Sequence, residues 1–172
     1  PALVIEPLNG YRTKERMPNN LGEFKIALGS VERLKEGTDI TLVSYGSTLN
    51  LCLQALPAIE KLGISIELID IQTLLPFDLN HDIKKSLEKT NRLLIVDEDV
   101  SAGATAYILE KILVEQEGYY CLDEAPKTLS AKDHRPAYGS DGDYFSKPSI
   151  DDIVETVYAM MSEADPRTYP GV

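Results

Sequence analysis

The sequence predicts an α/β domain in which a mostly parallel sheet carries helices on both faces. Short runs rich in Ile, Leu and Val, typical of strands buried on both sides, alternate along the chain with segments whose apolar residues recur at helical spacing. Glycine, proline and aspartate mark the turns between these segments. Alternation of this kind is typical of parallel β-α-β units with right-handed crossovers.

The size and charge of the chain narrow the classes of function. At 172 residues, with 43% hydrophobic and 26% charged residues, the chain has the composition of a soluble globular domain. No apolar run approaches the roughly 20 residues that span a bilayer. The net charge of -11 argues against nucleic acid as a partner, because phosphate binding needs clustered Lys and Arg. This charge is compatible with a basic protein partner. Solubility alone is the other explanation of the negative charge.

The cysteines and the first residue bear on the setting of the protein. Cys52 and Cys121 match neither a disulfide framework nor a metal-ligand spacing, so we expect reduced packing residues and a cytoplasmic location. The chain opens on Pro1 without a signal segment. We therefore expect it to be a piece of a longer protein.

The first 38 residues are expected to form an irregular lead-in to the domain. Residues 3–5 predict a short edge strand that ends before Pro7, because proline cannot donate to a continuing ladder. Residues 9–22 are polar, rich in asparagine and proline and without a period, and they predict a surface loop.

The first regular unit begins at residue 40. Residues 40–45, ITLVSY, predict a strand, and Ser47 or Thr48 can cap the helix that follows over residues 49–59. Residues 64–71, ISIELIDI, predict the next strand of the sheet.

The pattern continues through the middle of the chain. Asp78 is placed to cap a helix that ends at about Lys89. Residues 93–96 predict a strand buried on both faces, which a small-residue turn connects to a helix over about residues 104–117. Residues 126–129 predict a weaker strand.

The last part of the chain begins with a loop over residues 130–148, rich in Gly, Pro and Asp. Ser149 then begins a capping box with Asp152, followed by apolar residues on one face of the last helix. We expect the domain to span residues 1–162 and residues 163–172 to form a surface tail.

Few residues suggest catalysis. We expect His81 to be an exposed helical residue, and an adjacent acid, Asp133, is the one feature that favours a catalytic role for His134. No serine stands in a G-x-S-x-G elbow, and neither a dinucleotide fingerprint nor a phosphate loop is present. The residues alone therefore predict no catalytic site, no cofactor ligand and no metal ligand.

Three carboxylates, Asp97, Glu98 and Asp99, follow the predicted strand at residues 93–96. Such a cluster can supply paired catalytic acids or magnesium ligands. Carboxylates at strand ends also cap helices and form salt bridges between subunits. We favour a structural or interface role.

Three stretches carry a family resemblance: DITLVSYG at residues 39–46, IELIDIQTLLPFD at 66–78 and NRLLIVDED at 91–99. They resemble, in this order, the carboxy-terminal domain of the beta subunit of thiamine-diphosphate-dependent 2-oxo acid dehydrogenases of the pyruvate and branched-chain types. Residues 26–39 and 147–154 also resemble that family. The resemblance implies a three-layer α/β/α fold with a mixed, mostly parallel five-stranded sheet, as in the last domain of transketolase.

The resemblance also implies an activity for a parent enzyme, namely oxidative decarboxylation of a 2-oxo acid with acyl transfer to lipoyl groups. In that family thiamine diphosphate and magnesium lie between two other domains, so we expect no cofactor in this chain and no activity from it alone. The Gly-Asp-Gly motif followed by Asn-Asn is absent, since Asn19 and Asn20 precede the aspartates of residues 141–143.

The partners that the resemblance implies are other domains and subunits of the decarboxylating component and the subunit-binding domain of the dihydrolipoyl acyltransferase. An isolated assembly domain is also expected to associate with itself. Gln72 stands where the family commonly has arginine, and residues 101–108 depart from the family pattern. The candidate interface residues, which all stand at predicted strand ends, are Asp97, Glu98, Asp99, Gln72 and Tyr45.

Two alternatives remain. In the first, the chain is a self-standing domain that binds a small anion at a helix amino terminus, near Gly46 and Ser47 or near Ala102 and Gly103. In the second, it is the equivalent domain of a transketolase or a deoxyxylulose phosphate synthase.

Overall fold

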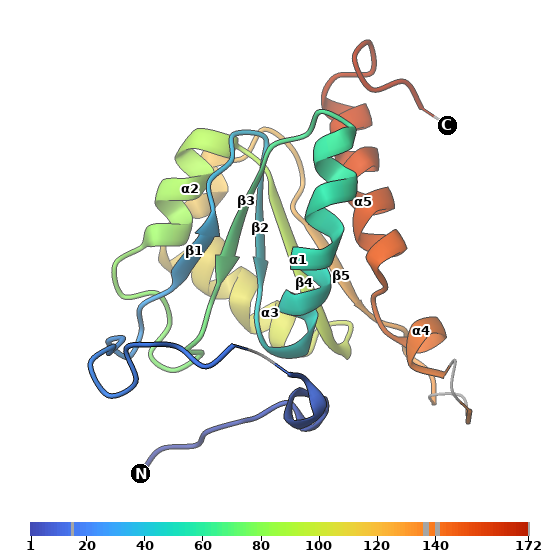
Figure 1. Cartoon of the computed structure of the whole chain (residues 1–172). Helices are drawn as coiled ribbons and strands as arrows, with labels where there is room; N and C mark the ends of the chain where they lie inside the picture. The colour runs from blue at the N-terminus through green and yellow to red at the C-terminus, as the bar shows by residue number, and fades with distance from the viewer. Residues whose placement is uncertain (15, 136–137, 140–141, 172) are drawn as a thin grey trace.

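A five-stranded sheet lies between two layers of helices (Figure 1). The computed structural model describes residues 1–14, 16–135, 138–139 and 142–171. In chain order the elements are η1 (Leu8–Arg12), β1 (Glu32–Lys35), β2 (Ile40–Ser44), α1 (Gly46–Lys61), β3 (Ile66–Asp70), α2 (Asp82–Thr90), β4 (Leu93–Val100), α3 (Ala104–Leu109), the π-helix η2 (Glu110–Glu115), η3 (Gly118–Cys121), β5 (Lys127–Ala131), α4 (Gly142–Ser146) and α5 (Ile150–Ala164).

The strand order is β1-β3-β2-β4-β5, with every pairing parallel except that of β1 with β3. The strand β2 is central: Val43 pairs with Ile69 of β3 on one side and Ile95 of β4 on the other. All five residues of β2 are buried, as its β-branched and apolar sequence predicts. The predicted three-layer α/β/α fold with a mixed, mostly parallel sheet is confirmed.

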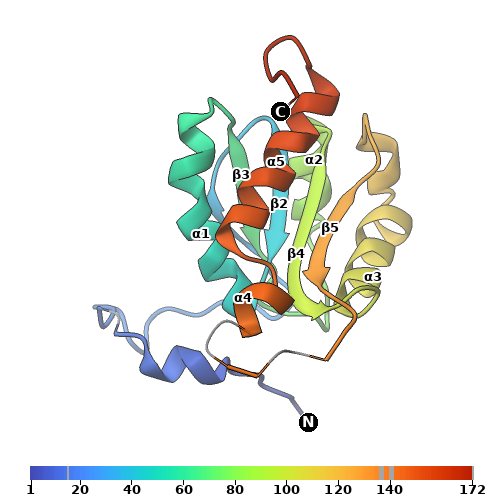
Figure 2. The same ribbon diagram turned by 90° about the vertical axis from the view of Figure 1, so that its right-hand side faces the viewer.

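Alternate residues of the inner strands supply two separate cores. Leu42 and Leu94 pack on one face with buried residues of α1 and α5. Val43 and Ile95 pack on the other face with buried residues of α2, α3 and η2. Figure 2 shows α1 and α5 together in front of the sheet, with α3 behind it. Because side chains of a strand alternate between faces, each strand joins the two cores.

Two predicted helix caps are confirmed. The Asp78 carboxylate accepts hydrogen bonds from the backbone amides of Asp82 and Ile83, at 2.9 Å each. Ser149 and Asp152 form the expected capping box, with 3.1 Å from the Asp152 amide to Ser149 Oγ and 2.8 Å from the Ser149 amide to Asp152 Oδ2.

The lead-in differs from its prediction. Residues 3–5 form no strand, since their side chains are exposed and none of the described strands pairs with them. The antiparallel edge strand is β1, which lies within the stretch expected to be irregular. Its sequence, ERLK, lacks the apolar pattern of the inner strands because three of its four residues are exposed.

Other element boundaries were also wrong. Neither Ser47 nor Thr48 caps α1, because the helix begins earlier, at Gly46, with φ of 61°. The strand β4 runs on to Val100, so the carboxylates of residues 97–99 lie inside it and not beyond it. His81 precedes α2 as its N-cap residue in the left-handed region. The predicted loop of residues 130–148 contains the short helix α4.

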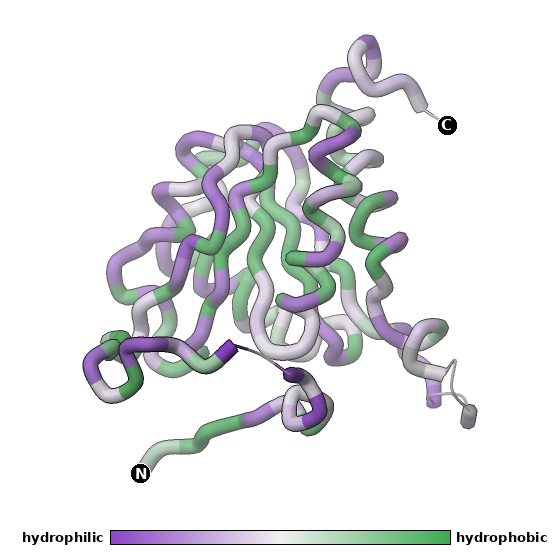
Figure 3. Tube along the Cα trace, in the orientation of Figure 1, coloured by the Kyte–Doolittle hydropathy of each residue, from purple (hydrophilic) through white to green (hydrophobic). Residues whose placement is uncertain are grey.

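The lead-in carries apolar side chains that the described chain does not cover. Figure 3 shows hydrophobic stretches along this segment, which runs beside the domain and away from its core. Leu3 is 87% exposed and Leu28 74% exposed. Apolar side chains gathered in this way are typical of a surface that another chain or domain covers.

No helix within the described part of the chain combines the length and the apolar character that crossing a membrane requires.

Gly37 provides a test of the packing at the amino end of the sheet. A Cβ at this position would lie 2.1 Å from the backbone carbonyl carbon of Ile66. Because backbone atoms cannot yield as a flexible side chain does, we expect Gly37→Ala to lower the free energy of unfolding by about 3 kcal/mol. Urea unfolding followed by circular dichroism measures this loss.

Gly46→Ala is the matched control for that substitution. Gly46 has a φ of 61° but open space where a Cβ would lie, so the loss should be only about 1 kcal/mol. Equal losses for the two variants would contradict the close approach at Gly37.

Candidate functional site

The five candidate interface residues lie at one edge of the sheet. Because β2, β3 and β4 are parallel, their carboxyl ends meet there, and ligands or partners of open α/β sheets bind at such edges. Tyr45 follows β2, Gln72 follows β3, and residues 97–99 form the last part of β4. We call these five residues the carboxyl-edge cluster.

Asp97 is the unusual member of the carboxyl-edge cluster. It is only 1% exposed, and its Oδ2 atom has no hydrogen-bond partner among the described residues. Burial raises the pKa of the Asp97 carboxyl, although a hydrogen bond with Tyr45 and backbone amides of the same strand oppose the shift. A buried carboxylate with an unmet oxygen is costly, so this oxygen is open to a further donor.

Tyr45 stands beside Asp97 as a hydrogen-bond donor. Burial raises the pKa of the Tyr45 hydroxyl, and the negative charge of Asp97 raises it further. The phenol therefore stays protonated at neutral pH. A protonated phenol beside Asp97 can donate to its carboxylate.

Three serines at the same edge share this lack of partners. Ser47 lies in the first turn of α1, Ser130 near the end of β5 and Ser146 at the end of α4. Figure 2 shows α4 below the ends of the strands. Their hydroxyl oxygens are buried and have no hydrogen-bond partner among the described residues. Buried polar atoms are nearly always satisfied in a complete structure. This edge therefore has unmet hydrogen-bonding capacity.

The other members of the cluster have partners within the chain. Lys147 Nζ lies 3.2 Å from Glu98 Oε2, and Asp99 Oδ1 accepts from the Val100 amide at 2.8 Å. Gln72 Nε2 donates to Glu32 Oε2 at 2.7 Å, which links the end of β3 to β1. These three side chains are exposed and are available to a partner surface as well.

The edge is a poor site for an anion or for thiamine diphosphate with magnesium. A Cβ at Gly103 would lie 2.2 Å from Asp99 Oδ2, so a carboxylate already occupies the space beside that turn. Three carboxylates would repel a diphosphate. Within the described residues, no three His, Cys, Asp or Glu side chains lie close enough to share a metal ion. The predicted loop of residues 130–148, which carries the aspartates of residues 141–143, lies partly outside the described residues.

The histidines do not form a catalytic pair with the acids. His134 Nδ1 lies 2.8 Å from the Arg135 carbonyl oxygen, and its ring is 5.5 Å from that of Phe145. His81 lies on the far side of the sheet from α5, at the start of α2.

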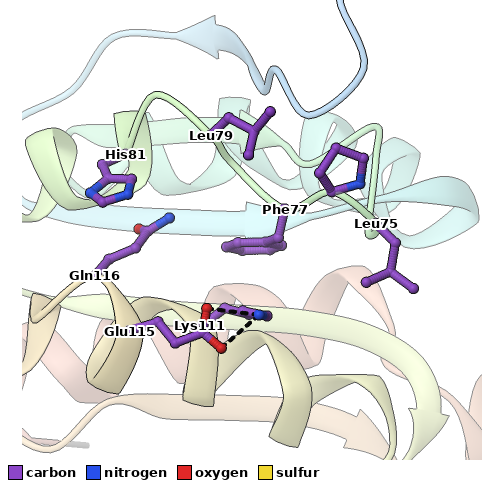
Figure 4. Close-up of a pocket in the computed structure, with 8 residues that line it drawn as sticks. Leu75, Phe77, Leu79, His81, Lys111, Glu115 and Gln116 are labelled. Carbon is purple, nitrogen blue, oxygen red and sulfur yellow. Dashed lines mark hydrogen bonds and ion pairs between the residues drawn. The ribbon is translucent and has the colours of Figure 1, made fainter.

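A cavity of about 280 Å³ lies apart from the carboxyl-edge cluster, between the loop that joins β3 to α2 and the helix η2 (Figure 4). Its apolar walls come from the loop and its charged side chains from η2. The lining residues are Leu75, Pro76, Phe77, Leu79, His81, Lys111, Glu115 and Gln116. Sequence reasoning missed this cavity, because segments some 30 residues apart form it; the π-helical turn that shapes one wall has no sequence motif.

Gln116 is the buried polar group of the cavity. It is 5% exposed, and its Nε2 donates to the carbonyl oxygen and to Oδ2 of Asp78, at 3.2 Å each. Its Oε1 has no partner among the described residues. At the mouth, Lys111 Nζ donates to both carboxylate oxygens of Glu115, at 2.6 and 2.7 Å. That hydrogen bond raises the pKa of Lys111.

Comparison with known proteins gives the family. The family model described as the transketolase C-terminal domain matches residues 29–147. The mitochondrial 2-oxoisovalerate dehydrogenase subunit beta of Chaetomium thermophilum is 40% identical over 129 residues, which cover 73% of this chain and 27% of that protein. The pyruvate dehydrogenase E1 component subunit beta of Chlorokybus atmophyticus is 30% identical over 157 residues, covering 91% of this chain and 46% of that protein.

Solved structures share the fold. A structure described as a split gene transketolase, inactive beta4 tetramer, superimposes with a TM-score of 0.65 and 21% identity, over 84% of this chain and 46% of that chain. The chain spans about half of such relatives, or less. The family resemblance drawn from residues 39–46, 66–78 and 91–99 is confirmed: the chain belongs to the transketolase C-terminal domain family, with beta subunits of pyruvate and 2-oxoisovalerate dehydrogenases among its relatives.

Proposed function

We propose that this chain is the assembly domain of the beta subunit of a 2-oxo acid dehydrogenase, and that its carboxyl-edge cluster contacts a neighbouring domain or subunit. The observation that carries the proposal is Asp97, a buried carboxylate with one oxygen that nothing in the described chain satisfies. A donor from a partner would meet that oxygen at little further desolvation cost.

The exposed apolar lead-in supports the same function. Leu3, Leu28 and their apolar neighbours have no cover within the described chain, and a domain built into a larger assembly leaves such a surface bare when it stands alone. We infer that the surface lies against another part of the parent enzyme and that the isolated chain associates with itself. The relatives are about twice as long as this chain or longer, which leaves room for such parts.

The parent enzyme would carry out oxidative decarboxylation of a 2-oxo acid with thiamine diphosphate and magnesium and pass the acyl group to a lipoyl group. We place the cofactor outside this chain, because the carboxyl edge repels a diphosphate. The net charge of -11 suits a basic partner such as the subunit-binding domain of the dihydrolipoyl acyltransferase. The free cysteines, Cys52 and Cys121, suit an intracellular, cytoplasmic setting.

The first test of this function is enzymatic. We expect the 172-residue chain to show no decarboxylation of pyruvate or 2-oxoisovalerate in the presence of thiamine diphosphate and magnesium, whereas the full-length parent protein should turn over one of them. A dye-coupled decarboxylation assay measures both. Turnover by the chain alone, or a parent protein without such activity, would contradict the proposal.

The second test uses Asp97→Asn and the pH dependence of stability. Below the ordinary pKa of 3.8 the carboxyl is protonated in both folded and unfolded states, so the variant and the wild type should differ little. As the pH rises through the raised pKa of the folded protein, the buried charge costs stability in the wild type alone. At pH 7 we expect the variant to be more stable by about 1 kcal/mol.

In the full-length parent the same substitution should weaken assembly, measured by analytical ultracentrifugation, because the partner's donor loses a charged acceptor. For the stability measurement on the isolated chain, Glu98→Gln is the control: Glu98 is exposed and paired with Lys147, so that stability should change little. Unaltered assembly of the Asp97→Asn parent would remove the interface role of Asp97.

A further inference from the structure

We propose that the cavity between the β3–α2 loop and η2 binds a small zwitterion with an apolar side chain, of the class of apolar α-amino acids. Figure 4 shows the loop residues Leu75, Phe77 and Leu79 on one side of the cavity and Lys111, Glu115 and Gln116 on the other. This site lies apart from the carboxyl-edge cluster, and the proposal does not depend on the assembly function.

The buried amide of Gln116 has an acceptor that is open to a donor from the ligand. Both acceptors on Asp78 face Gln116 Nε2, so the amide cannot be turned over without losing two hydrogen bonds. Oε1 is thereby fixed as an acceptor without a partner, at a residue that is 5% exposed. A ligand N–H group would satisfy it, and an ammonium group does so most strongly.

The charges of the cavity select a ligand with balanced charge. Lys111 and Glu115 pair with each other at the mouth, so the pair presents no net charge to attract a ligand with a single charge. A zwitterion can exchange partners with the pair: its carboxylate takes Lys111, and its ammonium takes Glu115 and Gln116 Oε1. Each of the four charges then keeps an opposite charge beside it.

The apolar walls and the volume of the cavity indicate the kind of side chain that the ligand carries. Phe77 is 8% exposed and packs edge-on against Tyr107, with ring centroids 6.1 Å apart, so its remaining surface belongs to the cavity floor. At about 30 Å³ for each water, a cavity of about 280 Å³ holds about nine waters, which is room enough for a molecule of the size of leucine.

The site is held in place before any ligand arrives. Tyr107 donates to the Leu74 carbonyl at 2.9 Å, and the Leu79 amide donates to the Gly29 carbonyl at 2.9 Å. Asp78 and His81 have φ values of 30° and 56°, and residues in such sparsely populated conformations cluster at functional sites. The other wall is a π-helical turn, which is also frequent at such sites.

Titration of the 172-residue chain with L-leucine, followed by nuclear magnetic resonance of ¹⁵N-labelled protein, tests the proposal. We expect saturable shifts at residues lining the cavity, with a dissociation constant below about 1 mM. 4-Methylpentanoate lacks the ammonium group and 3-methylbutylamine lacks the carboxylate, so each should bind at least about tenfold more weakly. Absence of saturation by L-leucine at 10 times that concentration, or equal binding of either analogue, would overturn the proposal.

Substitutions on η2 locate the site. Glu115→Gln and Lys111→Met each remove one charge at the mouth, and each should weaken L-leucine binding at least about tenfold. Glu155→Gln, on exposed α5 surface in the opposite helical layer, makes the same charge change as Glu115→Gln and should leave binding unchanged. Wild-type affinity in both η2 variants would overturn the assignment of this cavity.

Discussion

Complete burial of β2 constrains the rest of the structure. A strand with no exposed residue must find hydrogen bonds for its backbone on both sides and apolar neighbours on both faces. Pairing with β3 and β4 supplies the hydrogen bonds. The apolar neighbours come from α1 and α5 on one face and from α2 and α3 on the other. The layered architecture follows from these two requirements, and parallel pairing gathers the carboxyl ends of β2, β3 and β4 at one edge.

Each end of the sheet holds a buried carboxylate, and the two carboxylates differ in their partners. At the amino end, burial alone would raise the pKa of Glu67, but hydrogen bonds from Lys89, Ser86 and the Gly37 amide lower it. Arg33 adds an ion pair at 3.3 Å. At the carboxyl end, burial raises the pKa of Asp97 and its Oδ2 has no partner among the described residues. The Glu67 carboxylate has charged partners within the chain, whereas none of the described residues bonds Asp97 Oδ2.

The cavity beside η2 illustrates a second kind of incompleteness. Its unmet group is a neutral amide oxygen, and its charges, on Lys111 and Glu115, already balance. A site of this kind suits a small ligand more than a protein surface, because its volume and its single deep acceptor match one molecule. An assembly edge and a ligand cavity can therefore coexist in the domain, on different elements and with different chemistry.

The sequence by itself determined the inner strands, the caps made by Asp78 and Ser149, and the family, because apolar runs and caps are local and the three family stretches are contiguous. It misplaced the edge strand β1, whose charged residues become a strand only through pairing with β3. It found Asp97 as one of three carboxylates but not its burial, and it did not find the cavity at Gln116 at all. Tertiary structure decided these features because burial and unmet hydrogen bonds depend on residues distant in sequence, which only packing brings together.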